Sequence, residues 1–231
     1  MAVYAISDLH LSLGTDKPMD IFGGGWDGYV EKLEKNWREL ILPEDTVVIP
    51  GDISWAMKLP EVEADLRFID SLPGEKLLGK GNHDYWWGSV TKMNAFIEEL
   101  GLDSIKFLYN NAFLRDGIVI CGSRGWMIDG SDTADKKIQE REGIRLRISL
   151  DEAKKVCKPD QSPTVFLHYP PVHRGKVCEP IMDALRDYGV KYIYYGHLHG
   201  VRRDGLTFLH NDIRMTPISA DLIDFKPLLV E

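Results

Sequence analysis

Residues 76–84 read Lys-Leu-Leu-Gly-Lys-Gly-Asn-His-Asp, a short apolar run followed by glycines and three polar side chains. Such a run, bounded by turn residues, is typical of a buried strand. Gly81 supplies the backbone freedom that a sharp turn needs. Asn82, His83 and Asp84 then follow the strand with side chains that can bind a metal ion or transfer a proton. The stretch predicts a strand that ends in a functional site.

Four other short apolar runs end in the same way. They cover residues 3–6, 46–49, 164–167 and 191–195. The polar side chains that follow them are Asp8, His10, Asp52, His168, His197 and His199. Ligand sites in α/β sheets form at the carboxyl ends of strands. We therefore expect all these side chains to meet at one edge.

Segments with apolar residues at helical spacing separate several of these strands. We expect Asp27 to cap the first helix, Pro60 to open the second, Ser89 to cap the third and Pro180 to open a later one. The charged segment 132–158 predicts a further helix with a solvated face and a capping box at residues 149–152.

The middle of the chain has a different pattern. Three close-spaced apolar runs at 105–108, 112–114 and 118–121 are separated by Asn-Asn and Asp-Gly pairs, which predicts hairpins. Together with the alternating strands and helices, this pattern indicates an α/β fold of two packed sheets flanked by helices. We expect a single domain spanning residues 1–231, and we assign no element to the segment after residue 209.

Composition excludes several classes of protein. The chain is 44% hydrophobic and 28% charged, as expected for a globular protein, and its net charge of −8 argues against a protein that coats nucleic acid or an anionic membrane. Three scattered cysteines do not form a disulfide framework or a cysteine metal site. There is neither a signal peptide nor an apolar run that could span a bilayer, so we expect a cytoplasmic protein.

The strand-end residues have the chemistry of metal ligands. Aspartate, histidine and asparagine without a thiolate suit Mn²⁺ or iron in octahedral geometry, with Zn²⁺ as an alternative, and they suit Ca²⁺ poorly. One such motif alone is more often structural than functional. Five together are hard to explain as packing, because clustered buried carboxylates and imidazoles are costly without metal or proton partners.

The order of these motifs resembles that of the calcineurin-like metallophosphoesterase superfamily. The matching motifs are Asp8-x-His10, Gly51-Asp52, Gly81-Asn82-His83-Asp84, His168 and Gly196-His197-x-His199. The resemblance implies a two-sheet sandwich and hydrolysis of a small phosphate ester at two metal ions. It also implies one metal held by Asp8, His10, Asp52 and His199, and a second held by Asp52, Asn82, His168 and His197.

The same resemblance implies a mechanism. Two cations about 3.5–4 Å apart hold the phosphoryl group and activate a bridging hydroxide for in-line attack. Asp52 would bridge the metals, and His83 would donate a proton to the leaving oxygen. Asp84 would orient the His83 imidazole and raise its pKa.

Departures from relatives bear on the substrate. Phosphoprotein phosphatases carry phosphate-clamping arginines after the bridging aspartate and the Asn-His pair, whereas here Asp52 precedes Ile-Ser-Trp and His83 precedes Asp-Tyr-Trp. Their absence favours a phosphodiester, whose single charge needs less neutralisation. The alternatives are a phosphomonoesterase or phosphoprotein phosphatase, a nuclease and a non-catalytic metal-binding scaffold. His83 also separates the chain from lipid A-type diphosphatases, which have arginine there.

Two further sets of residues stand near the motifs. The tryptophans are Trp26, Trp55, Trp86, Trp87 and Trp126. We interpret them chiefly as packing around the site, with a platform for a nucleobase-like group as the alternative. The candidate phosphate contacts, most of which we interpret as ordinary surface charge, are Arg124, Arg174, Arg202 and Arg203.

Overall fold

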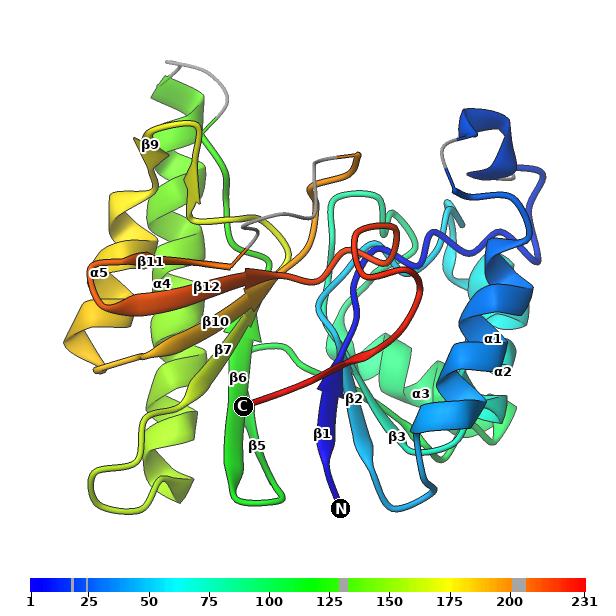
Figure 1. Ribbon diagram of the computed structural model, residues 1–231, viewed down its shortest axis with the longest axis horizontal. Helices are drawn as coiled ribbons and strands as arrows, with labels where there is room; N and C mark the ends of the chain where they lie inside the picture. Colours follow the sequence, from blue (N-terminus) through cyan, green and yellow to red (C-terminus); the bar gives the residue numbers. More distant parts are fainter. Residues whose placement is uncertain (18, 24, 129–132, 201–206) are drawn as a thin grey trace.

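Two β-sheets lie face to face between two layers of helices in the computed structural model of the chain (Figure 1). The structure describes residues 1–17, 19–23, 25–128, 133–200 and 207–231. These layers are the two packed sheets flanked by helices that the sequence predicts.

The first sheet has the strand order β13-β1-β2-β3-β4, and β1 to β4 are parallel. Its strands are β1 (Val3–Ala5), β2 (Thr46–Ile49), β3 (Glu75–Leu78), β4 (Ile105–Phe107) and β13 (Leu228–Leu229). The second sheet has the order β11-β12-β10-β7-β6-β5, and β6, β7, β10 and β12 are parallel. Its strands are β5 (Ala112–Arg115), β6 (Ile118–Ser123), β7 (Thr164–Leu167), β10 (Tyr192–Tyr195), β11 (Phe208–His210) and β12 (Ile213–Pro217). A small hairpin pairs β8 (Val172–His173) with β9 (Lys176–Val177).

Strand periodicity divides the apolar side chains between the layers. In β2, Val47 and Ile49 face the helices while Val48 faces the other sheet. In β7, Val165 likewise faces helices and Phe166 lies between the sheets. Fully buried strands therefore read as continuous apolar runs, which is why the sequence displays them clearly.

Helices cover the outer face of each sheet (Figure 1). The first sheet is covered by α1 (Tyr29–Leu40), α2 (Glu63–Ser71) and α3 (Val90–Leu100), and the second by α4 (Thr133–Val156) and α5 (Glu179–Asp187). Two 3₁₀ turns, η1 (Met19–Phe22) and η2 (Leu59–Val62), precede α1 and α2. The predicted roles of Pro60, Ser89 and Pro180 at helix starts are confirmed.

Two predicted caps are wrong. Gly28, not Asp27, is the N-cap of α1, and it has left-handed backbone with no side-chain cap. The expected capping box at 149–152 lies inside α4, where Ser149 Oγ donates to the Asn111 carbonyl and accepts from the Gly122 N–H. A serine on the buried face of a helix can serve a neighbouring strand and loop, which a local pattern does not reveal.

One predicted hairpin is confirmed and one is wrong. Asp116 and Gly117, both with positive φ, form the two-residue turn between β5 and β6. By contrast, β4 pairs with β3 in the first sheet, and the chain crosses to the second sheet at Asn110 and Asn111. The segment after residue 209, to which we assigned nothing, supplies β12 and β13.

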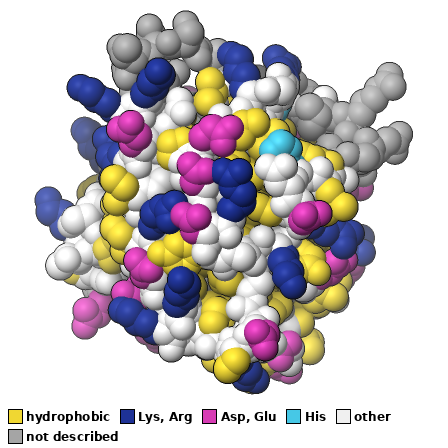
Figure 2. Space-filling view, turned by 90° about the vertical axis from the view of Figure 1, so that its left-hand side faces the viewer, with side chains coloured by type: hydrophobic (Ala, Val, Ile, Leu, Met, Phe, Trp, Pro, Cys, Tyr) yellow, Lys and Arg dark blue, Asp and Glu magenta, His cyan; other side chains and the backbone are white. Residues whose placement is uncertain are grey.

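The predicted charged helix with a solvated face is α4, which also has a buried face. Leu146, Leu150 and Ala153 pack onto the second sheet. Figure 2 shows basic and acidic side chains interspersed over the opposite face of the α4–α5 layer. Among the described residues, no helix combines the length and apolar character needed to cross a bilayer.

Candidate metal centre

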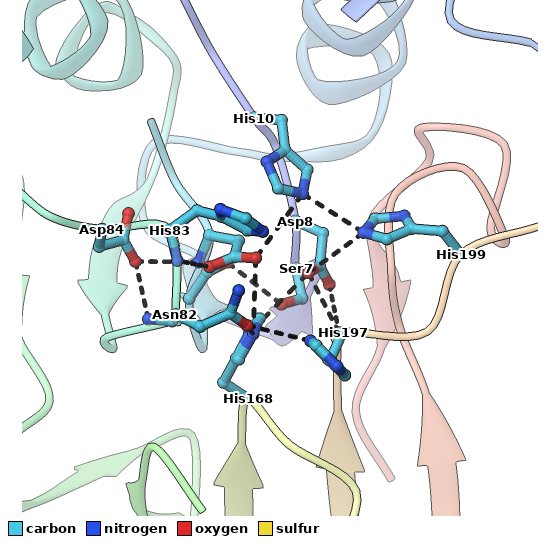
Figure 3. Close-up of polar contacts among 12 residues, drawn as sticks. Ser7, Asp8, His10, Asn82, His83, Asp84, His168, His197 and His199 are labelled. Carbon is cyan, nitrogen blue, oxygen red and sulfur yellow. Dashed lines mark hydrogen bonds and ion pairs between the residues drawn. The ribbon is translucent and has the colours of Figure 1, made fainter. Parts of the chain in front are cut away.

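The seven predicted ligand residues come together where strands of both sheets end, and all of them except Asp52 are labelled in Figure 3. Asp8 and His10 follow β1, Asp52 follows β2, Asn82 follows β3, His168 follows β7, and His197 and His199 follow β10. The first sheet thus contributes oxygen and imidazole donors, and the second contributes imidazoles only.

One group of potential ligand atoms belongs to Asp8, His10 and His199. His199 Nε2 lies 3.7 Å from Asp8 Oδ1 and 3.3 Å from His10 Nε2. Two imidazole nitrogens that face each other this closely need a proton or a cation between them. These three side chains could hold a metal ion.

A second group belongs to Asp52, His168 and His197. Asn82 completes it, because its Oδ1 lies 2.7 Å from His168 Nε2 and 3.0 Å from His197 Nδ1. An amide oxygen between two imidazole nitrogens forms a compact mixed donor set that could hold a second ion.

Asp52 lies between the two groups. Its Oδ2 is 3.5 Å from His168 Nε2 in the second group and 3.7 Å from His10 Nε2 near the first. Its Oδ1 accepts a hydrogen bond of 2.8 Å from the His83 backbone N–H, so the carboxylate is held in place.

The backbone around these side chains is strained. Asp8, His10, Asp52 and His197 have φ values of 59°, 46°, 50° and 71°, in the left-handed region that non-glycine residues rarely adopt. Such residues persist only where the surrounding structure holds them, and they cluster at functional sites. Here the Asp8 N–H donates to the Gly51 carbonyl and the His197 N–H donates to the Asp8 carboxylate.

Gly81 is required for close approach rather than for a turn. It does not have positive φ, and a Cβ there would lie 2.1 Å from Asp52 Oδ1. Our expectation of a glycine-specific turn at Gly81 is therefore wrong. Gly196 has the same role on the other sheet, where a Cβ would lie 2.3 Å from Asp8 Oδ2.

A family model described as "Calcineurin-like phosphoesterase" matches residues 1–201. The chain belongs to the calcineurin-like phosphoesterase family. A comparison with curated proteins finds no match. The family and the fold confirm the resemblance that the motifs indicate.

Solved structures share the fold of this calcineurin-like phosphoesterase at low sequence identity. One is AQ665 from Aquifex aeolicus, a protein of unknown function, at 19% identity, a TM-score of 0.57 and coverage of 99% of this chain and 95% of that one. A phosphopantetheinyl hydrolase from Mycobacterium tuberculosis has 13% identity, a TM-score of 0.54 and coverage of 99% and 95%. The protein TT1561 of Thermus thermophilus has 15% identity, a TM-score of 0.59 and coverage of 99% and 97%.

As a member of this family the chain is a metal-dependent hydrolase of phosphate esters, and the family typically binds a dinuclear metal centre. The electrostatics of the site fit that group. Burial raises the pKa of Asp8 to about 6, and burial together with Asp8 and Asp84 raises that of Asp52. Burial lowers the pKa of His10 and His168. The raised pKa values mean that burial disfavours the charged aspartates, and the lowered values mean that it disfavours protonated histidines. A bound cation would stabilise the ionised aspartates, and the neutral imidazoles are the form that binds a metal.

The predicted contact between Asp84 and the His83 imidazole is wrong. The buried Asp84 carboxylate accepts from the backbone N–H groups of Gly81, Asp52, Ile53 and Ser54 and from the Trp86 indole. Among the described residues, the buried His83 Nδ1 has no hydrogen-bond partner. Burial, with His199 and Lys17 nearby, lowers the pKa of His83. Asp84 thus fixes the loops after β2 and β3 to each other instead of acting on His83.

Several supporting residues carried no local signal in the sequence. Asp221 Oδ1 lies 2.9 Å from His199 Nδ1. The Tyr29 hydroxyl donates to the His10 carbonyl at 2.8 Å. The buried Asp65 carboxylate accepts from Ser54 Oγ and from the Leu13 N–H, and so joins the loops after β1 and β2 to α2. These contacts are long-range, so neither spacing nor periodicity reports them.

A cleft of about 290 Å³ opens over the two groups. It is lined by His10, Met19, Trp26, Asp52, Trp55, His83, His197 and His199. Trp86 and Trp87 are buried in the core beside α3, in agreement with the packing interpretation.

The two candidate arginines that the structure describes, Arg124 and Arg174, do not line this cleft. Arg124 lies 3.5 Å from the buried Glu142 carboxylate, and its guanidinium packs over Trp126. Arg174 lines a separate surface pocket beside the β8–β9 hairpin. Arg202 and Arg203 lie outside the described residues.

Proposed function

We propose that residues 1–231 form one domain that hydrolyses phosphodiesters at two metal ions, with manganese or iron as the native metals and zinc as the alternative. The position of Asp52 Oδ2 carries the proposal, because it lies 3.5 Å and 3.7 Å from imidazole nitrogens that belong to opposite sides of the site. A carboxylate in that position can bridge two cations and screen them from each other.

The proposed ligand sets follow from this bridge. Asp8, His10, Asp52 and His199 would hold one ion, and Asp52, Asn82, His168 and His197 the other. When bound, two such ions would polarise the phosphoryl oxygens and lower the pKa of an attacking water.

His83 is the proposed proton donor to the leaving oxygen. Its ring lines the cleft and lies 5.6 Å from that of His10, centroid to centroid. Its backbone is tied to Asp52 Oδ1, which keeps the imidazole at a set distance from the bridging carboxylate. Asp84 supports this arrangement through the backbone hydrogen bonds that it accepts.

The preference for a diester rests on charge. Of the described residues that line the cleft, none is a lysine or an arginine, and the Lys17 ammonium lies beside it, 5.9 Å from the centroid of the Trp55 ring. A phosphomonoester dianion usually requires such a cation in addition to the metals, whereas a diester monoanion does not. One structural neighbour is named a phosphopantetheinyl hydrolase, and this name supports the proposal of hydrolysis on this fold.

The test is hydrolysis of bis-p-nitrophenyl phosphate by protein loaded with Mn²⁺. We expect turnover that chelation abolishes and that His83→Ala reduces by about 10²–10⁴-fold without loss of bound metal. Metal-loaded protein that is inert toward both this diester and p-nitrophenyl phosphate would overturn the enzymatic assignment. Faster turnover of p-nitrophenyl phosphate would replace the diesterase with a phosphomonoesterase.

A further inference from the structure

Three apolar side chains from different parts of the chain wall the cleft. Met19 comes from η1, Trp26 precedes α1 and Trp55 follows β2. The volume of about 290 Å³ is at the lower end for small-molecule pockets, so it can accept the phosphate group of a diester together with one compact substituent of the two.

The two tryptophans differ in what they contact. Trp26 is only 5% exposed, and its ring packs edge-on against Tyr29 and Phe225. It also lies 6.0 Å from the His10 ring and 5.8 Å from the His199 ring, so packing around the site explains its position.

Trp55 is half-buried, and its ring centroid lies 4.4 Å from that of His83. The His10 ring stacks on Trp55 at 4.9 Å, and the Lys17 ammonium lies 5.9 Å from the Trp55 centroid. Trp55 is therefore the apolar wall that adjoins the proposed proton donor.

A second aromatic ring adjoins His83. Tyr85 is 56% exposed, and its ring lies 6.2 Å from the His83 ring in an edge-on arrangement. Trp55 and Tyr85 come from the loops after β2 and β3, so His83 has aromatic neighbours from two separate segments. Because His10 stacks on one face of Trp55, a flat ligand would contact the rest of the Trp55 ring and the exposed ring of Tyr85.

We propose that the ester substituent on the His83 side of the cleft is a flat aromatic ring, such as an aryl group or a nucleobase, which Trp55 binds by stacking. The inference rests on the proposed function and specifies the substrate class of that site. A substituent whose oxygen is within reach of His83 lies next to Trp55, because the two rings are in contact. Stacking on an aromatic side chain tolerates any flat ring and discriminates against puckered ones.

The test compares a flat and a puckered six-carbon ring in two ligands of otherwise equal connectivity, monomethyl phenylphosphonate and monomethyl cyclohexylphosphonate. Both place a six-carbon ring on phosphorus through a carbon bond that is not an ester. Calorimetric titration of the Mn²⁺-loaded protein should give a Kd about fivefold lower or better for the phenyl compound. Trp55→Leu should bring the ratio of the two Kd values close to one, and Trp55→Phe should retain part of the preference.

Trp126→Leu is the matched control, because this ring packs against Tyr169 and does not line the cleft. It should leave the ratio unchanged.

Equal Kd values in the unmodified protein would overturn the inference while leaving the proposed function intact, since the metals would still bind both phosphonates. An unchanged ratio in Trp55→Leu would overturn the assignment to Trp55. Failure of metal-loaded protein to bind either compound would overturn the inference and the proposed phosphate site together. If Trp55→Leu does not fold, the ratios in the unmodified protein and in Trp55→Phe decide the question.

Discussion

The Asp221 carboxylate holds the His199 imidazole in place. Its Oδ1 lies 2.9 Å from His199 Nδ1, and its Oδ2 accepts a 3.0 Å hydrogen bond from the Gly200 N–H. Ser219 and Ala220, just before Asp221, are themselves tied to Ser7 beside β1. The C-terminal segment thus joins a proposed ligand of the second sheet to the end of β1, beyond the region that the family model matches.

Asp221→Asn should weaken metal binding. Carboxylates that orient a metal-binding histidine typically contribute about 10–100-fold to metal affinity. Titration with Mn²⁺ should show a loss of this size in one of two sites. Asp187→Asn, which alters an exposed ion pair between α4 and α5, should leave both sites unchanged. Equal Mn²⁺ affinities in the two variants would refute the role of Asp221.

Gly81→Ala should disrupt the centre. The new methyl group would lie 2.1 Å from Asp52 Oδ1 and 2.3 Å from the Asp52 backbone nitrogen, so the loops must separate. We expect a loss of stability of about 1–3 kcal/mol, as for other overpacked sites, together with reduced metal content. Gly88→Ala is the control, since a Cβ there meets nothing within 4 Å. Metal analysis and thermal unfolding of both variants measure the difference.

Asp84→Asn should destabilise the fold. Each carboxylate oxygen accepts hydrogen bonds from N–H groups, so an amide nitrogen on either side would face donors. We expect a loss of about 2–3 kcal/mol in the free energy of unfolding, measured with urea. Asp116→Asn, in a turn that tolerates asparagine, should be nearly neutral. If Asp84→Asn keeps full stability but loses turnover, the result would support the predicted action of Asp84 on the His83 imidazole instead.

Lys76 should make stability depend on alkaline pH. Its buried ammonium donates to the carbonyls of Asp70 in the last turn of α2 and of Leu72 and Gly74 just after it. Burial lowers its pKa from 10.5 to about 8. The unfolded chain therefore binds more protons between these two values, and the free energy of unfolding should rise as pH increases from about 8 to 10.5. Lys76→Met should lose this rise in urea titrations across that range, although it leaves three carbonyls unpaired. An identical pH slope in both proteins would contradict the assignment.

Metal removal should lower the melting temperature. The buried Asp8 and Asp52 carboxylates lose their counter-ions in the metal-free protein, while a ligand that binds only the folded state stabilises it by mass action. Calorimetry should show a higher Tm with Mn²⁺ than with a chelator. Asp52→Asn should reduce that difference strongly, because the proposed bridge is altered. An equal Tm with Mn²⁺ and with a chelator would argue against binding of Mn²⁺ to the folded state.

The sequence by itself determined the layered fold and the set of residues that meet at the site. Buried parallel strands appear as continuous apolar runs such as 46–49 and 164–167, and the polar residues that follow them must lie at the carboxyl edge. This reasoning depends only on local pattern and on the geometry of parallel sheets. It needs no knowledge of which strands are neighbours.

Only the tertiary structure decided which groups these residues contact. In the folded chain the Asp84 carboxylate accepts from four backbone N–H groups, and β4 pairs with β3 in the first sheet. The Asp221 carboxylate contacts His199. The tertiary structure also made Gly81 necessary because of Asp52, a residue 29 positions earlier in the chain. Such contacts depend on side-chain direction and on segments distant in sequence that pack together, and neither leaves a periodic trace in the chain.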